Sequence, residues 1–453
     1  MIAERSRLAP ILLLFFAAAV AAQDFPPDQQ PPQPAEVPQA ADPAPAPRPR
    51  RPAPPPAPPP LSIPPWPVES VGPPILLAAG DPASDAFIGP PLVPPFRILD
   101  SEVLPGASAR LEWNASQSFS GGEVVSPVVV VHGLRPGPVL CLTAGVHGDE
   151  LNGVEIVRRI TNEVDPKQLG GTIVAVPIVN LFGFSRNSRY LPDRRDLNRY
   201  FPGSRYGSIA SRIASSFFEN VVRHCDSLVD FHTGSFDRSN LPQVRADLAR
   251  PQVQEFTRGF GATTVLHSPG TRGMLRTAAT LSGVPSVTFE VGGPGELQPV
   301  EIAHGVQAIH TLLHKLGMSR NLPVWSEPQP YYYESSWVRS DAGGVLLSEV
   351  TLGQRVERGE LLGKVIDPIH NLERELRSPV VGRVIGMARN QVVLPGFAAY
   401  HVGEETSASD AMHKAEAGQT PAPPVEEDAP PDEEHAPGDE LLPPDPEDEF
   451  EAD

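Results

Sequence analysis

Short apolar runs alternate with helical patterns through the middle of the chain, from Phe96 to about Leu322. Near-continuous Val, Ile and Leu predict strands, whereas apolar residues spaced three and four apart predict helices. The expected strands are 128–132, 139–143, 171–179, 227–231 and 284–291, and the expected helices are 151–164, 209–224 and 300–316. Such alternation is typical of a mainly parallel or mixed sheet with helices on both faces. We therefore expect an α/β domain over residues 96–322, with ligands bound at the carboxyl ends of its strands.

The pattern changes after Pro323. Short potential strands are now separated by turns that contain glycine, as at Asp341–Gly344 and Arg358–Glu360. This pattern predicts a small all-β domain over residues 323–403.

Both ends of the chain differ from this foldable part. Residues 1–22 combine Arg5 and Arg7 with an apolar run over 8–20 and small residues near Ala21, which is typical of a secretory signal. The run is shorter than the roughly 20 residues that span a bilayer, although an uncleaved anchor remains the alternative. Residues 23–95 are rich in proline and alanine and predict an extended spacer. We expect the protein to be exported, and thus periplasmic or secreted.

The net charge of −19 belongs almost entirely to the last segment. Residues 404–453 hold eighteen acidic residues and one basic residue, Lys414, so we expect an acidic disordered tail there. The rest of the chain is close to neutral, and no basic face indicates a nucleic-acid partner. The two cysteines, Cys141 and Cys225, are equally compatible with a disulfide and with two buried thiols.

Candidate metal ligands follow two of the predicted strands. His147 and Glu150 lie three residues apart at the start of a predicted helix, so both side chains can reach one ion. His232 ends the strand at 227–231, where a third ligand would come from a separate strand. Two His and one Glu form an established ligand set for catalytic zinc. A helix-capping Glu150 and a hydrogen-bonded strand-end His232 are the structural alternatives.

Further polar residues suit hydrolytic chemistry. Glu290 lies within an apolar strand, where a carboxylate is costly to bury unless it is paired or catalytic, and it is the candidate general base. Arg199 beside Asn198 suits a carboxylate, because a guanidinium and an amide together supply several donors. Arg189 is a candidate for stabilising the oxyanion on the attacked carbonyl.

This combination resembles the succinylglutamate desuccinylase/aspartoacylase family of zinc carboxypeptidase-like hydrolases. The resemblance covers about residues 97–403, and its motifs are matched by Gly145–Glu150, Asp196–Arg199, Asp230–Gly234 and Phe289–Gly292. It implies that His147, Glu150 and His232 bind one Zn²⁺ per chain. It also implies that Asn198 and Arg199 hold a substrate carboxylate and that Glu290 is the base.

We therefore expect an exported zinc-dependent amide hydrolase, a deacylase that acts on an N-acyl amino acid or a related small carboxylate-bearing amide. Two alternatives remain open. One is a zinc metallocarboxypeptidase that acts on short peptides, and the other is a non-catalytic scaffold. The acyl group, the amino acid and the oligomeric state do not follow from the sequence.

Overall fold

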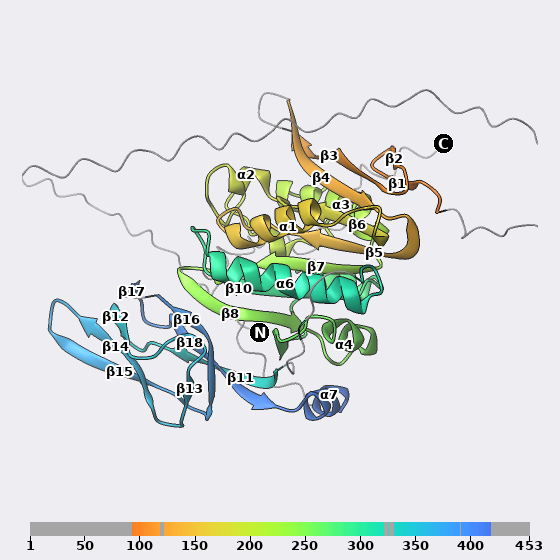
Figure 1. Cartoon of the computed structure of the whole chain (residues 1–453). Coiled ribbons are helices and arrows are strands. Elements are labelled where there is room, and N and C mark those ends of the chain that lie inside the picture. Colours follow the sequence, from red (N-terminus) through yellow and green to blue (C-terminus); the bar gives the residue numbers. More distant parts are fainter. Residues whose placement is uncertain (1–92, 118–121, 321–324, 326–329, 390, 418–453) are drawn as a thin grey trace, which may run out of the picture. The chain divides into compact units, whose positions relative to one another are not determined.

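The computed structural model describes residues 93–117, 122–320, 325, 330–389 and 391–417 (Figure 1). The predicted signal at 1–22, nearly all of the predicted spacer at 23–95 and most of the predicted acidic tail lie outside these residues. Within the described ranges, no helix combines the length and the apolar character needed to cross a bilayer.

The structure contains three sheets built from the following strands. They are β1 (Phe96–Ile98), β2 (Ser101–Val103), β3 (Ala107–Gln117), β4 (Glu123–His132), β5 (Arg135–Thr143), β6 (Gly170–Val176), β7 (Ser227–His232), β8 (Arg238–Ala246), β9 (Thr264–His267), β10 (Ser286–Gly292), β11 (Tyr331–Arg339), β12 (Gly344–Ser348), β13 (Arg355–Val356), β14 (Leu361–Asp367), β15 (Leu372–Arg377), β16 (Gly382–Ala388), β17 (Val392–Val393) and β18 (Ala398–Thr406).

Helices follow or separate the strands of the α/β part. The α-helices are α1 (Leu151–Glu163), α2 (Leu181–Phe184), α3 (Ile209–Asn220), α4 (Pro251–Thr257), α5 (Leu275–Leu281), α6 (Pro299–Lys315) and α7 (Ala408–Glu416). Two short 3₁₀ helices are η1 (Leu197–Arg199) and η2 (Val222–His224).

The largest sheet has twelve strands in the order β13-β16-β18-β11-β9-β8-β10-β7-β5-β6-β4-β3. At its centre β6, β5, β7 and β10 are parallel neighbours, whereas β8 runs antiparallel to β10. The carboxyl ends of the four parallel strands therefore meet at one edge, and the start of β8 lies at the same edge. The predicted α/β fold is confirmed.

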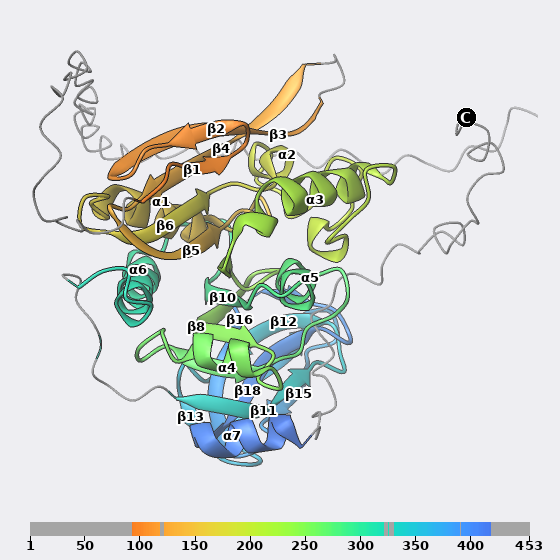
Figure 2. The same cartoon turned by 90° about the vertical axis from the view of Figure 1, so that its right-hand side faces the viewer.

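Helices cover both faces of the central strands. In β5, Leu140 and Leu142 belong to the core that also holds α1 and α6, whereas Cys141 belongs to the core that holds α3 and α5. Alternate residues of a strand point to opposite faces, so one apolar run fills both cores. Figure 2 shows α6 on one side of β10, with α3 and α5 on the other.

The β-rich region after residue 330 shares the large sheet with the α/β part. Strand β11 pairs with β9, and β16 pairs with β8, while β12, β14, β15 and β17 form a separate sheet of four strands. The described residues on both sides of the predicted boundary accordingly belong to one compact unit. The boundary predicted at 322/323 marks a change of architecture, but the main sheet continues across it.

The predicted start of the disordered tail at residue 404 is wrong in position. Strand β18 extends to Thr406, and α7 follows from Ala408 to Glu416. Ala411, Met412 and Ala415 of α7 are buried in the same core as α1 and α6. The acidic composition obscured this helix because only one of its faces is apolar.

Cys141 of β5 and Cys225, which precedes β7, form a disulfide. Both residues are buried, so the bond lies inside the core between the two strands that lead to the candidate metal ligands.

Candidate metal centre

The three predicted ligands meet at the carboxyl edge of β5 and β7. His147 lies in the loop after β5, Glu150 directly precedes α1, and His232 is the last residue of β7. Glu150 occupies the N-cap position of α1 but makes no side-chain capping hydrogen bond. Its carboxylate points to the two histidines instead, which excludes the capping alternative for this residue.

The ligand atoms converge on one point. His147 Nδ1 lies 2.8 Å from Glu150 Oε1, and His232 Nδ1 lies 3.0 Å from Glu150 Oε2. The two Nδ1 atoms are 3.1 Å apart, and the three ligand atoms all lie within 4.8 Å of one another. Two imidazole nitrogens and a carboxylate, all buried and facing each other, form a donor set that suits zinc.

Each histidine contacts a second carboxylate through its other ring nitrogen, Nε2. His147 Nε2 lies 3.0 Å from Asp196 Oδ1, and His232 Nε2 lies 2.7 Å from Asp230 Oδ2. Such outer carboxylates fix the ring orientation and the tautomer of a ligating histidine, so that Nδ1 is left for the ion. The sequence motifs alone did not indicate this role for Asp196 or Asp230. The spacing of Asp230 and His232 could have indicated it, because residues two apart in a strand share a face.

The electrostatics of the cluster favour a bound cation. Burial alone would lower the pKa of His232, but Asp230 and Glu150 outweigh it and raise the pKa well above its usual value. Burial alone would raise the pKa of Asp196, but Arg189 and His147 hold it well below the usual range. The carboxylates of Glu150, Asp196 and Asp230 thus lie within contact distance of the two histidines, in a setting that favours positive charge.

Arg189 contacts both the candidate ligands and Ser235 in the cavity wall. Its Nη1 donates to Ser235 Oγ at 2.7 Å and lies 3.3 Å from Glu150 Oε1, while its Nη2 lies 3.0 Å from Asp196 Oδ2. Nη1 is also 3.2 Å from His147 Nδ1. The guanidinium is therefore held beside the ligand atoms.

Asn198 and Arg199 lie together in η1. The Asn198 side-chain oxygen accepts a hydrogen bond from the Leu275 backbone N–H at 2.8 Å, which leaves the amide NH₂ group as a donor. Arg199 is half-buried, and its Nη1 donates to the Asn198 carbonyl oxygen at 3.1 Å. Both side chains line the same cavity as the ligands. Their donors suit a carboxylate, although this binding role stays a prediction.

Glu290 lies on β10 in register with His232 of β7. Its side chain is buried, with Oε2 accepting from Asn240 Nδ2 at 3.1 Å and Oε1 lying 3.4 Å from Arg245 Nη1. Asn240 and Arg245 both come from β8, which the sequence analysis did not predict as a strand. The structure thus supplies partners for Glu290 that the sequence left unassigned.

One cavity, with a volume of about 30 Å³, is lined by all seven predicted site residues. Its walls are His147, Glu150, Arg189, Asn198, Arg199, His232, Thr233, Ser235, Arg245, Met274, Arg276, Thr288 and Glu290.

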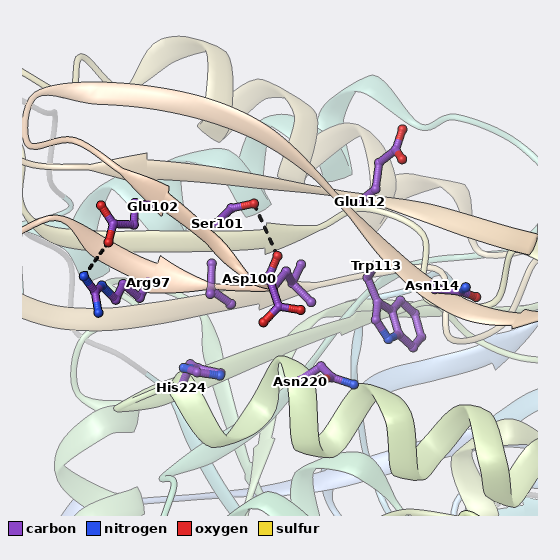
Figure 3. A pocket seen from close by; sticks show the side chains of 11 residues that line it. Arg97, Asp100, Ser101, Glu102, Glu112, Trp113, Asn114, Asn220 and His224 are labelled. Carbon is purple, nitrogen blue, oxygen red and sulfur yellow. Dashed lines mark hydrogen bonds and ion pairs between the residues drawn. The ribbon is translucent and has the colours of Figure 1, made fainter.

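A second cavity lies between the N-terminal strands and α3 (Figure 3). Arg97 and Glu102 form an ion pair of 2.5 Å in its wall, and Ser101 Oγ donates to the Leu99 carbonyl oxygen. Its acidic residues Asp100, Glu102 and Glu112 and its histidine, His224, are not part of the convergent ligand group found among the described residues. We therefore assign the chemistry to the cavity that contains His147.

Comparisons with known proteins agree with this assignment. The family model of the Succinylglutamate desuccinylase/Aspartoacylase catalytic domain matches residues 136–316. The N-alpha-acetyl-L-2,4-diaminobutyric acid deacetylase of Halomonas elongata is 30% identical over 258 residues, which cover 54% of this chain and 75% of that relative.

Solved structures share the fold. The product-bound ectoine utilization protein EutE (DoeB) from Ruegeria pomeroyi has a TM-score of 0.60 and 25% identity, covering 66% of this chain and 95% of that chain. A succinylglutamate desuccinylase/aspartoacylase from Rhodobacter sphaeroides has a TM-score of 0.61 and 23% identity, covering 69% of this chain and 100% of that chain.

The mixed α/β fold, the site and the relatives together define this protein as a hydrolase that acts on amides. It belongs to the succinylglutamate desuccinylase/aspartoacylase family.

Proposed function

We propose that this chain is an exported zinc-dependent deacylase that hydrolyses the amide bond of an N-acyl amino acid or a related small carboxylate-bearing amide. One observation carries the proposal: two histidines and a glutamate converge in a cavity that also contains Glu290. The name of the Halomonas relative, an acetyl-diaminobutyrate deacetylase, supports a small N-acyl amino acid as the substrate class.

His147 Nδ1, the Glu150 carboxylate and His232 Nδ1 would hold the ion, since they are buried and converge. Zinc, when bound there, would supply Lewis acidity that polarises the scissile carbonyl and lowers the pKa of a water molecule to about 7. Asp196 and Asp230 keep the two rings oriented through their Nε2 atoms.

Glu290 serves as the general base and then as the general acid. It takes a proton from the attacking water and delivers it to the leaving amine, so that the amide bond breaks without expelling an amide anion. Arg189 donates to the oxyanion of the tetrahedral species, because its Nη1 already lies beside the ligand atoms.

Asn198 and Arg199 orient the substrate through its carboxylate. The side-chain oxygen of Asn198 accepts a hydrogen bond from the Leu275 N–H. The Asn198 NH₂ group can therefore donate to a substrate carboxylate alongside the Arg199 guanidinium. A charge-assisted pair of this kind fixes both the position and the direction of a carboxylate.

Export is supported by two independent features. Residues 1–22 have the pattern of a secretory signal, and Cys141 and Cys225 form a disulfide, a bond that persists mainly in oxidising compartments. Cell fractionation tests this directly. Recovery of the protein in the cytoplasm with free thiols would contradict export.

The mechanism predicts that Glu290→Gln retains zinc and loses at least about 100-fold in kcat, because a general base contributes 10²–10⁴ in rate. Glu301→Gln on α6, outside the cavity, is the control and keeps wild-type turnover. Near-wild-type turnover of Glu290→Gln would exclude it as the base.

A substrate panel separates the deacylase from its alternatives. N-acyl amino acids should be cleaved with higher kcat/KM than short peptides with free C-termini. The reverse order would favour a metallocarboxypeptidase. A zinc-loaded protein that cleaves neither class would favour a non-catalytic scaffold.

A further inference from the structure

Asn240 lies between the candidate base and the β-rich region. It sits on β8, opposite Gly292 of β10 on one side and opposite Gly386 of β16 on the other. Only 1% of its surface is exposed. A buried amide at the junction of three strands has a restricted choice of partners, which makes its contacts informative.

The donor end of this amide contacts Glu290. Asn240 Nδ2 donates to Glu290 Oε2 at 3.1 Å. The other carboxylate oxygen, Oε1, is 3.4 Å from Arg245 Nη1 on the same strand. Strand β8 therefore contacts both carboxylate oxygens of Glu290. The hydrogen bond from the uncharged Asn240 amide is shorter than the contact with the Arg245 guanidinium.

The acceptor end of the amide packs against β16. A Cβ atom at Gly386 would come within 2.7 Å of Asn240 Oδ1 and 3.3 Å of His401 Cβ. Such an approach is closer than non-bonded atoms tolerate, so Asn240 can keep its place only while residue 386 has no side chain. The Asn240 amide is thus confined between Glu290 and the backbone of Gly386.

We propose that Asn240 is a positioning residue for Glu290 and that β16 of the β-rich region, through Gly386, holds Asn240 in place. The inference rests on the proposed function, in which Glu290 transfers protons. A base must lie within hydrogen-bonding reach of the water that it deprotonates, and displacement by about 1 Å can cost about 100-fold in rate. The β-rich region consequently contributes to turnover through a sheet contact.

The test compares Asn240→Ala and Gly386→Ala in the full-length, zinc-loaded chain, each with and without Glu290→Gln. Gly343→Ala is the matched control, because a Cβ there meets only ordinary contacts, at 3.5 Å, in the same β-rich region. We expect Asn240→Ala to lower kcat about 100-fold and Gly386→Ala about 10-fold, with KM changed less than about threefold. Gly343→Ala stays within about twofold of the wild type in kcat.

The double variants distinguish positioning from general damage. If Asn240 acts through Glu290, its removal costs nothing further in the Glu290→Gln background, where residual rates are measured at high enzyme concentration. Fully additive losses, loss of zinc, or wild-type kcat in Asn240→Ala would overturn the inference. Wild-type kcat in Gly386→Ala would overturn the role of β16. An active Glu290→Gln single variant would instead overturn the proposed function, so the two failures are distinguishable.

Discussion

At the scale of single residues, two carboxylates determine which nitrogen of each candidate ligand faces the cavity. Asp230 accepts from His232 through Nε2 and also from Thr143 Oγ1 at 2.7 Å, so its own position is fixed by β5. Asp196 pairs with His147 and with Arg189. The ligand geometry therefore depends on residues that would not themselves contact the ion.

The Asp230→Asn variant tests this dependence. The amide loses the negative charge that orients His232, and we expect zinc affinity to fall about 10–100-fold. Titration against a competing chelator measures it. Asp367→Asn is the control, because Asp367 and His370 form a pair of the same 2.7 Å length on the surface of the β-rich region. Equal zinc affinity in both variants would refute the orienting role.

A partly buried histidine away from the site, His304, makes stability depend on pH. Burial lowers the pKa of His304 to about 4. Above pH 6.5 the ring is neutral in both the folded and the unfolded chain. As pH falls from 6.5 to 4, only the unfolded chain takes up the proton, so folding loses stability over this window, by about 3 kcal/mol at most.

The His304→Gln variant should flatten this part of the pH profile. Glutamine retains a polar group for Thr263 Oγ1, which lies 3.1 Å from His304 Nε2, but it does not titrate. Denaturant unfolding at pH 7, 5.5 and 4 measures the difference, with His370→Gln on the surface as the control. An unchanged slope in His304→Gln would show that His304 does not contribute to the acid sensitivity.

At the scale of elements, the parallel strands were predictable from sequence, whereas β8 was not. The buried runs of β5, β7 and β10 are mostly apolar, and the motif residues lie within these strands or shortly after them. In β8, by contrast, Asn240 and Arg245 are buried polar residues whose partners come from β10 and β16. Long-range pairing hides such a strand, because polar residues ordinarily indicate a solvent-exposed segment.

The site shows the same division. All seven predicted residues were singled out by motif, and the structure places them around one cavity. Their supporting residues, such as Asp230 and Asn240, were missed, because their roles depend on the distance to a partner that the sequence does not place. Ser235 was likewise missed, because only its 2.7 Å hydrogen bond from Arg189 shows that it belongs to the site.

Helix α7 offers a prediction at this scale. Met412 is 8% exposed and belongs to the core that contains Phe256 and Tyr331. Met412→Ala should lower the free energy of unfolding by about 2–3 kcal/mol, because it leaves a cavity. His413→Ala is the control, since the His413 side chain is 82% exposed. Equal stability of the two variants in denaturant unfolding would show that α7 does not pack as described.

At the scale of the whole molecule, one sheet connects the α/β part to the β-rich region. Strands β16, β18 and β11 continue the order that begins with β3, so the large sheet includes described strands from both sides of the predicted boundary. A truncation that tests the acidic segment must therefore end after Ala417, because an earlier cut removes α7 or shortens β18.

The shared sheet predicts cooperative unfolding. Differential scanning calorimetry of the full chain should show one transition, because separating β16 from β8 or β11 from β9 would expose the core of both regions. Two resolved transitions, one of them restricted to residues 330–406, would contradict this description.

The most direct test of the central claim is zinc content. Purified wild-type protein should hold about one zinc per chain, as a three-ligand catalytic site does. His232→Ala should lose the metal and the amidase activity together, whereas Glu290→Gln should keep the metal and lose only the activity. His401→Ala, a buried histidine outside the cavity, is the control and should keep the zinc. A wild-type protein without metal, or a His232→Ala variant that keeps it, would contradict the assignment of the site.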